Sequence, residues 1–184
     1  MPVNTWTHLA VTYDGTTLSL FRNGVLVTSR PATGLVAAAS GAVATSTSTL
    51  QIGASQFGEY FNGLIDEVSV YDRALSPPDI QALSAATPTP VASWKLDENS
   101  GSVAADASGN GNTATLGGGS AWAAGVTGGA IQLDGVSGQL SVPNSPSLNP
   151  AGAFSVAAWV EPKAAASDFR AVVEIGRASC RERV

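Results

Sequence analysis

The stretch from Tyr60 to Leu83 constrains the fold most, because it has the pattern of a long strand followed directly by a short helix. Alternation along the strand would place Asp66 on the same face as Val68 and Val70, in an otherwise apolar row. An ionised carboxylate buried there without a partner is strongly destabilising. We therefore expect hydrogen bonds, a cation or a metal ion at Asp66.

The helix that follows has clear start signals. Ser76 is a predicted N-cap, Pro77 would occupy the first helical position, and Asp79 lies three residues after the cap, as in a capping box. The whole pattern, G-x-I-D-E-V-x-V-Y-x-R-A-L-S before a capped helix, resembles the closing strand of laminin-G-like jelly rolls. These domains belong to the concanavalin A-like lectin/glucanase group.

This resemblance implies a fold and a setting. The fold would be all-β, an antiparallel two-sheet jelly-roll sandwich with one short helix. Such domains are often secreted, often repeated, and often hold a structural Ca²⁺. The localisation that follows is extracellular or at a bacterial cell surface.

The first part of the chain predicts a three-stranded meander. Strands are expected at Trp6–Tyr13, Thr16–Arg22 and Val25–Ser29, joined by Asp14-Gly15 and Asn23-Gly24. These dipeptides are strong hairpin signals because type I′ turns need positive φ at both central positions. The opening W-x-H-x-A-x-T-Y-D-G also resembles the middle of a laminin-G-like domain. The lone His8 is expected to be a packed, hydrogen-bonded residue.

The second part reads as further strands. VASWKLDENSG would place Trp94 and Leu96 on one face, IQLDGVSGQLSVP predicts a hairpin around Asp134 to Gly138, and FSVAAWVEP predicts another strand. The series W-x-L-D-E, D-x-S-G-N-G-N, L-D-G and S-V-A-A-W-V resembles the opening half of the same family.

The order of the two halves is therefore inverted. Residues 1–84 resemble the C-terminal half of one domain, residues 85–90 (AATPTP from Ala85) a Pro/Thr linker, and residues 91–174 the N-terminal half of the next domain. We expect the two halves to close into one circularly permuted sandwich, because terminal strands of such folds are usually neighbours. Neighbouring repeats would then be partners in the parent chain.

Residues 175–184, IGRASCRERV, differ from the rest by a sudden density of arginine and the single cysteine. They are similar to the translation of a common sequencing adapter. We expect this tail to be artefactual and Cys180 to have no redox role.

Composition excludes two classes of partner. Only 12% of the 184 residues are charged and the net charge is −5, so no basic run can neutralise phosphates of a nucleic acid. No apolar stretch approaches the roughly 20 residues of a membrane helix. The opening MPVNTWTH shows no signal peptide in this fragment.

Two kinds of binding site are predicted. Ca²⁺ takes oxygens from carboxylates, amides and carbonyls, and the family resemblance assigns that role to Asp66, Asp106, Asn110 and Asn112. The alternative is that the loop residues form only Asx turns and that Asp66 accepts backbone N–H bonds. Exposed aromatic side chains could stack on sugars. The candidates are Trp122, which could equally cover the sandwich edge, and Phe57 and Tyr60.

Catalysis is not expected. The adjacent pairs Asp66-Glu67 and Asp97-Glu98 would split to opposite faces of a strand, so they cannot form the roughly 5 Å couple of a retaining glycosidase. The sequence therefore predicts a non-catalytic extracellular module that binds polysaccharide or glycan. The alternatives are an adhesion or spacer repeat that binds extracellular protein, and an accessory module of a glycoside hydrolase or sialidase.

Overall fold

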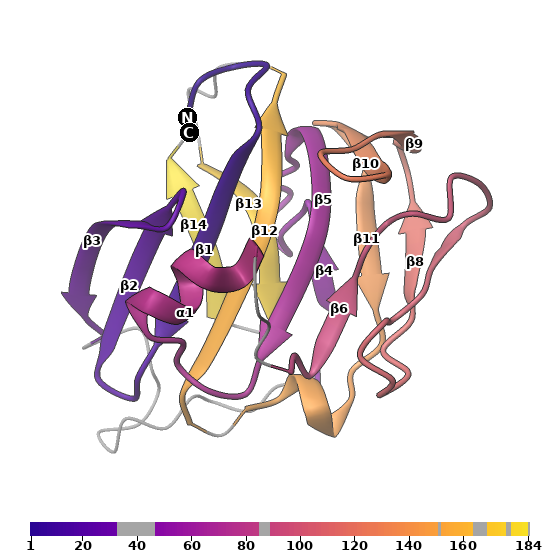
Figure 1. Cartoon of the computed structure of the whole chain (residues 1–184). Helices are drawn as coiled ribbons and strands as arrows, with labels where there is room; N and C mark the ends of the chain where they lie inside the picture. The colour runs from indigo at the N-terminus through magenta and orange to yellow at the C-terminus, as the bar shows by residue number, and fades with distance from the viewer. Residues whose placement is uncertain (33–46, 85–88, 151, 164–168, 176–177, 184) are drawn as a thin grey trace.

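The computed structural model describes residues 1–32, 47–84, 89–150, 152–163, 169–175 and 178–183. Two antiparallel sheets pack face to face, and one short helix lies across the outer face of the larger sheet (Figure 1). The predicted all-β, two-sheet sandwich with a single short α-helix is confirmed. Within the described residues, no helix is long and apolar enough to span a bilayer.

The larger sheet has eight strands in the order β3-β2-β1-β12-β5-β10-β9, with β6 also paired to β5. Its strands are β1 (Thr7–Tyr13), β2 (Thr17–Arg22), β3 (Val25–Pro31), β5 (Asn62–Tyr71), β6 (Ala92–Trp94), β9 (Ser120–Ala124), β10 (Gly129–Asp134) and β12 (Phe154–Pro162).

The second sheet has six strands in the order β14-β13-β4-β11-β8-β7. They are β4 (Leu50–Ile52), β7 (Val103–Ala104), β8 (Ala114–Gly117), β11 (Gln139–Val142), β13 (Phe169–Ile175) and β14 (Ala178–Arg183). Helix α1 (Pro77–Gln81) continues into the 3₁₀ turn η1 (Ala82–Ser84), and a second 3₁₀ turn, η2, spans Pro146–Leu148.

Both parts of the chain build one core. Strand β12 lies between β1 and β5 in the larger sheet, and β4 lies between β13 and β11 in the smaller one (Figure 1). The main apolar cluster accordingly contains Ile65 and Val70 from the first part and Trp94 and Ile131 from the second. That the two parts come from successive repeats stays a prediction. Residues 85–88 of the predicted linker lie outside the described residues. The same holds for residues 176–177 and 184 of the predicted tail.

Turn chemistry set the local strand connections with one exception. The hairpins β1–β2 and β2–β3 form at Asp14-Gly15 and Asn23-Gly24, as predicted. The predicted hairpin around Asp134 to Gly138 is wrong, because β10 and β11 belong to different sheets. The Asp134 carboxylate accepts the N–H groups of Val136, Ser137 and Gly138, which turns the chain from one sheet to the other.

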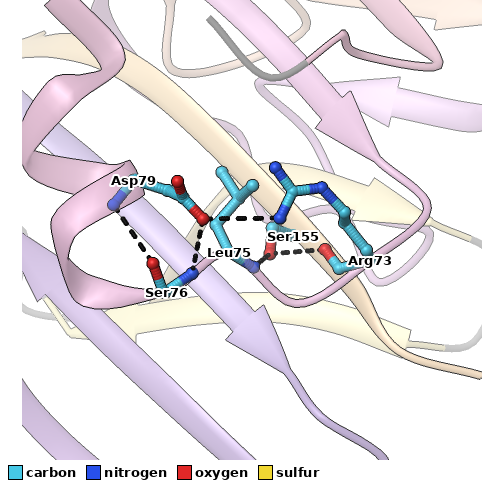
Figure 2. Close-up of polar contacts among 5 residues, drawn as sticks. All are labelled: Arg73, Leu75, Ser76, Asp79 and Ser155. Carbon is cyan, nitrogen blue, oxygen red and sulfur yellow. Dashed lines mark hydrogen bonds and ion pairs between the residues drawn. The ribbon is translucent and has the colours of Figure 1, made fainter.

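Helix α1 is held by its N-terminal cap and by a contact between the preceding loop and β12 (Figure 2). Ser76 and Asp79 form the predicted capping box, and Arg73 pairs with Asp79 at 3.4 Å. The buried Ser155 of β12 accepts the N–H of Leu75 at 2.8 Å and donates to the carbonyl of Arg73 at 2.9 Å. The helix thereby closes a second, smaller apolar cluster, made of Ala10, Phe21, Tyr71, Leu75, Ile80 and Ala157.

A β-bulge in β5 overturns the predicted alternation. Ala157 of β12 pairs with Ser69 and Trp159 pairs with Asp66, so β5 contains one extra residue at this point. Glu67 has a φ of 49°, and the phase of the strand changes there. Ile65, rather than Asp66, therefore joins Val68 and Val70 in the main core.

Candidate functional site

Asp66 is buried at a site where both parts of the chain meet. It is 0% exposed, and its Oδ2 accepts the N–H groups of Val126 at 2.9 Å and Thr127 at 3.3 Å. These donors belong to the turn between β9 and β10. Oδ1 is buried and has no hydrogen-bond partner of good geometry among the described residues. A buried carboxylate oxygen without a partner is a cost that a bound cation would remove.

Acidic side chains surround Asp66 and influence its protonation. Burial raises the pKa of Asp66, and the nearby Asp97 adds to the rise, while N–H groups of Thr127, Glu67 and Val126 lower it in part. Burial, Asp66 and Asp97 also raise the pKa of Glu67, against the opposing charge of Lys95. Two further acidic side chains, the half-buried Glu67 and the exposed Asp97, thus act on the buried carboxylate of Asp66.

Further oxygens lie beside β10, next to the turn that binds Asp66. Glu67, Leu96 and Asn99 all have positive φ, at 49°, 60° and 58°. A side chain at Gly129 would contact the Leu96 carbonyl oxygen and Asn99 Oδ1, so both atoms lie beside Gly129, where the turn joins β10. Strained backbone of this kind persists only where surrounding structure imposes it.

Asp66, Asn99 and Leu96 have oxygens of the chemical kinds that bind calcium. Ca²⁺ binds carboxylate, amide and backbone carbonyl oxygens. Asp66 Oδ1 would supply the first kind, Asn99 Oδ1 the second and the Leu96 carbonyl the third. In the described part of the chain no three acidic, histidine or cysteine side chains converge on one point, so such an ion would depend on neutral oxygens as well.

The other predicted metal ligands form a separate loop. Asp106 accepts from the Ser93 N–H, from both donors of Ser108 and from the Asn112 N–H. Burial raises the pKa of Asp106, but these hydrogen bonds outweigh it and hold the pKa below its usual value. Asn110 and Asn112 both donate to the Val91 carbonyl.

This loop shares no hydrogen bond with Asp66 among the described residues. Ser93 pairs with Ser69, three residues along β5 from Asp66, which places Asp106 about 10 Å further along the strand. In the structure Asp106 makes an Asx-type bond with the Ser108 N–H, whereas Asn110 and Asn112 donate to the Val91 carbonyl. That this loop binds Ca²⁺ stays a prediction.

Of the three predicted sugar-binding aromatics, Trp122 belongs to β9, whereas Phe57 and Tyr60 share the loop between β4 and β5. Trp122 packs against the main core and its indole N–H donates to the Gly101 carbonyl at 2.8 Å, so it covers the sandwich edge. Phe57 is 66% exposed, in the loop between β4 and β5. Tyr60 is half-buried and forms a single β-bridge with Ala54 at the base of that loop.

The Phe57 loop is held against the outer face of the six-stranded sheet. Ser55 Oγ donates to Glu59 Oε2 at 2.8 Å and accepts the Phe57 N–H at 3.2 Å. The Gln56 N–H donates to Glu174 Oε1 at 3.5 Å. Since Glu174 pairs with Gln51 across β13 and β4, the backbone of this loop lies next to that sheet face.

A row of polar side chains crosses this face. Gln51 alternates with the buried Leu50 and Ile52, so its side chain points away from the core. It pairs with Ser141 of β11, and its Nε2 donates to Gln139 Oε1 at 3.3 Å. Gln51 Oε1 is buried and has no hydrogen-bond partner among the described residues. The half-buried amides of Gln51 and Gln139 thus line the outer face of this sheet.

Sequence reasoning missed Asp97, Asn99, Gln51 and Gln139 as site residues. Asp97 was visible as half of an acidic pair, but only the turn between β9 and β10 brings it to Asp66. The amide row was readable in principle, since Gln51 alternates with apolar residues within L-Q-I and Gln139 precedes L-S-V.

Comparison with known proteins supports the same family. Residues 1–81 match the model of a family described as the concanavalin A-like lectin/glucanases superfamily. The prediction made from the closing strand and its helix is confirmed for these residues.

A curated protein is similar to this chain over 84 residues. Over 84 residues the chain is 36% identical to an alpha-L-arabinofuranosidase of Bifidobacterium longum subsp. longum, a match that includes 44% of this chain and 7% of that enzyme. The chain thus spans a small fraction of that relative. No solved structure matches the chain at the same level of significance.

Proposed function

We propose that this sandwich, whose residues 1–81 are a segment of the concanavalin A-like lectin/glucanase superfamily, is a non-catalytic module that binds an uncharged glycan. Its setting would be a secreted or surface-attached protein of several domains. The partial match to an arabinofuranosidase supports an accessory role beside a glycoside hydrolase domain. The whole parent protein's activity is a separate question, because fold alone does not assign function.

One observation supports this proposal above the others. Phe57 is 66% exposed on a loop whose Gln56 N–H is bonded to Glu174, and Glu174 pairs with Gln51, the first residue of the amide row. Sugar rings bind to such surfaces by stacking an apolar face on the aromatic ring while amides take the hydroxyl groups. The carboxylates of Glu59 and Glu174 flank the loop, which disfavours acidic glycans.

A catalytic role is not proposed. Asp66 and Asp97 interact electrostatically, and both accept backbone N–H bonds. Asp66 is 0% exposed, so it does not reach a substrate at the surface. A glycosidase needs two carboxyl groups that flank an accessible bond.

The glycan proposal is tested on an array of uncharged polysaccharides, followed by affinity electrophoresis on the ligands found. Phe57→Ala and Gln51→Ala should each weaken binding by about tenfold or more, roughly 1.4 kcal/mol. Val136→Ala is the matched control, since Val136 is equally solvent-exposed in another turn and should bind normally. Absence of any glycan ligand, with protein partners recovered instead, would favour the adhesion alternative.

We also infer that Ca²⁺ binds at Asp66 as a structural ion, where it would neutralise the buried charge and tie the β9–β10 turn to β5. At a Ca²⁺ concentration about 100 times the Kd, the free energy of unfolding should rise by about 2.7 kcal/mol. In Asp66→Asn this Ca²⁺ effect should disappear, while the metal-free variant should be no less stable, because burial of the charge is costly.

The control for this experiment is Asp14→Asn, which changes an exposed turn acid far from Asp66 in sequence and should keep the full response to Ca²⁺. Asp106→Asn adds a second comparison, since the structure leaves Asp106 outside the Asp66 site. An unchanged melting midpoint of the wild type with Ca²⁺ and with chelator would refute the metal without touching the glycan proposal.

A further inference from the structure

The two parts of this chain interdigitate so that neither completes a sheet alone. We propose that residues 1–84 of one copy can be completed by residues 91–175 of a second copy, so that the partner of this chain is another molecule of itself. The exchange would use the same contacts that close the single chain. It rests on topology and is independent of the glycan and Ca²⁺ proposals.

The first argument is the position of β12. It pairs along its length with β1, from Thr7–Val160 to Tyr13–Phe154, and on its other side with β5, from Gly63–Pro162 to Tyr71–Ser155. Both neighbours belong to the first part of the chain (Figure 1). Without β12, the edges of β1 and β5 would have unpaired N–H and C=O groups, which is the state that recruits another strand.

The second argument is that the smaller sheet repeats this arrangement in reverse. Strand β4 of the first part pairs with β11 through Leu50–Val142 and with β13 through Ile52–Val173. The second part therefore inserts β12 between two strands of the first, and the first part inserts β4 and β5 each between two strands of the second. This mutual insertion makes each part a complement for the other, whichever molecule supplies it.

The third argument is the polar bonds across the junction, which add selectivity to apolar burial. Ser155 of the second part takes the Leu75 N–H and binds the Arg73 carbonyl of the first part (Figure 2). The N–H groups of Val126 and Thr127 bind Asp66 in the same way. An unrelated strand would leave these buried groups unpaired, at a cost of about 1–3 kcal/mol each.

The fourth argument is the connection between the parts. Turn η1 ends at Ser84, and Val91 already donates its N–H to the Val70 carbonyl, so six residues, 85–90, join the halves. Closed and exchanged forms contain the same contacts outside this segment. Protein concentration and linker length therefore decide between them.

The main test uses two full-length variants, each with one damaged part. Val156→Pro disables β12 and Ile65→Pro disables β5, because proline removes an N–H from a central strand. Refolded separately, neither should give the near-UV circular dichroism of the buried Trp94. Refolded together, they should form a 1:1 heterodimer containing one native sandwich from the two intact parts, detected by native mass spectrometry.

The matched control pairs two variants damaged in the same part, Val156→Pro with Val160→Pro, which should give no recovery. A mixture of Val156→Pro and Ile65→Pro whose signal equals the sum of the separate samples would count against exchange.

Wild-type protein gives an independent measurement. After refolding at a hundredfold higher concentration, the dimer fraction by light scattering should rise at least tenfold, and deletion of two linker residues should raise it further. A monomer under all these conditions overturns the proposal.

Discussion

At the scale of single residues, His8 gives the fold a dependence on pH. It is 9% exposed, its ring meets Trp159 edge-on at 5.2 Å, and burial lowers its pKa below 6.5. Below pH 6.5 the unfolded chain therefore binds a proton that the folded chain does not. The free energy of unfolding should decrease as pH falls through this range. Urea denaturation should show this loss in the wild type and a flatter profile in His8→Gln, whereas identical profiles would contradict it.

A second prediction at this scale concerns Gly125, in the turn that binds Asp66. A Cβ there would overlap the Gly129 carbonyl oxygen and Asp66 Oδ2, and neither can move freely. Gly125→Ala should destabilise the protein by about 2 kcal/mol. Gly152→Ala is the matched control, because nothing lies within 4 Å of its Cβ position, and it should be close to neutral. Equal stability of the two variants would show that the turn is not tightly packed.

At the scale of elements, the attachment of helix α1 depends more on the strand beneath it than on its own cap. Ser155→Ala would leave the buried Leu75 N–H without an acceptor and should cost about 1–3 kcal/mol. Ser76→Ala removes an exposed N-cap and should cost about 1 kcal/mol or less. Equilibrium unfolding of both variants ranks them. A larger loss of stability from Ser76→Ala would mean that the helix depends more on its N-cap than on Ser155 of β12.

At the scale of the whole molecule, the two parts should hold together without a covalent link. We expect that a protease site inserted in the segment 85–90, cleaved after folding, leaves both pieces in one particle. The insertion itself should cost little, since each doubling of loop length costs only about 0.6 kcal/mol. Size-exclusion chromatography of the cleaved protein measures this. Separation of the pieces under native conditions would show that the shared core is weaker than its burial indicates.

The sequence by itself determined the local elements of this protein. The capped helix after β5, the turns at Asp14-Gly15 and Asn23-Gly24, and the strand Phe154–Pro162 follow from short-range chemistry, which neighbouring residues supply in full. The family of residues 1–81 was also readable, because its motif lies in one continuous stretch.

Only the tertiary structure decided which residues meet. The bulge at Glu67, which turns Asp66 out of the core row, exists because β12 pairs with β5 out of simple register. The chain after Asp134 crosses to the other sheet because its new partners lie there. Asp66 meets the β9–β10 turn rather than the Asp106 loop for the same reason. The bond between Asp66 and the β9–β10 turn joins residues 60 positions apart in the chain. A pattern of neighbouring residues cannot predict which distant segments pack together.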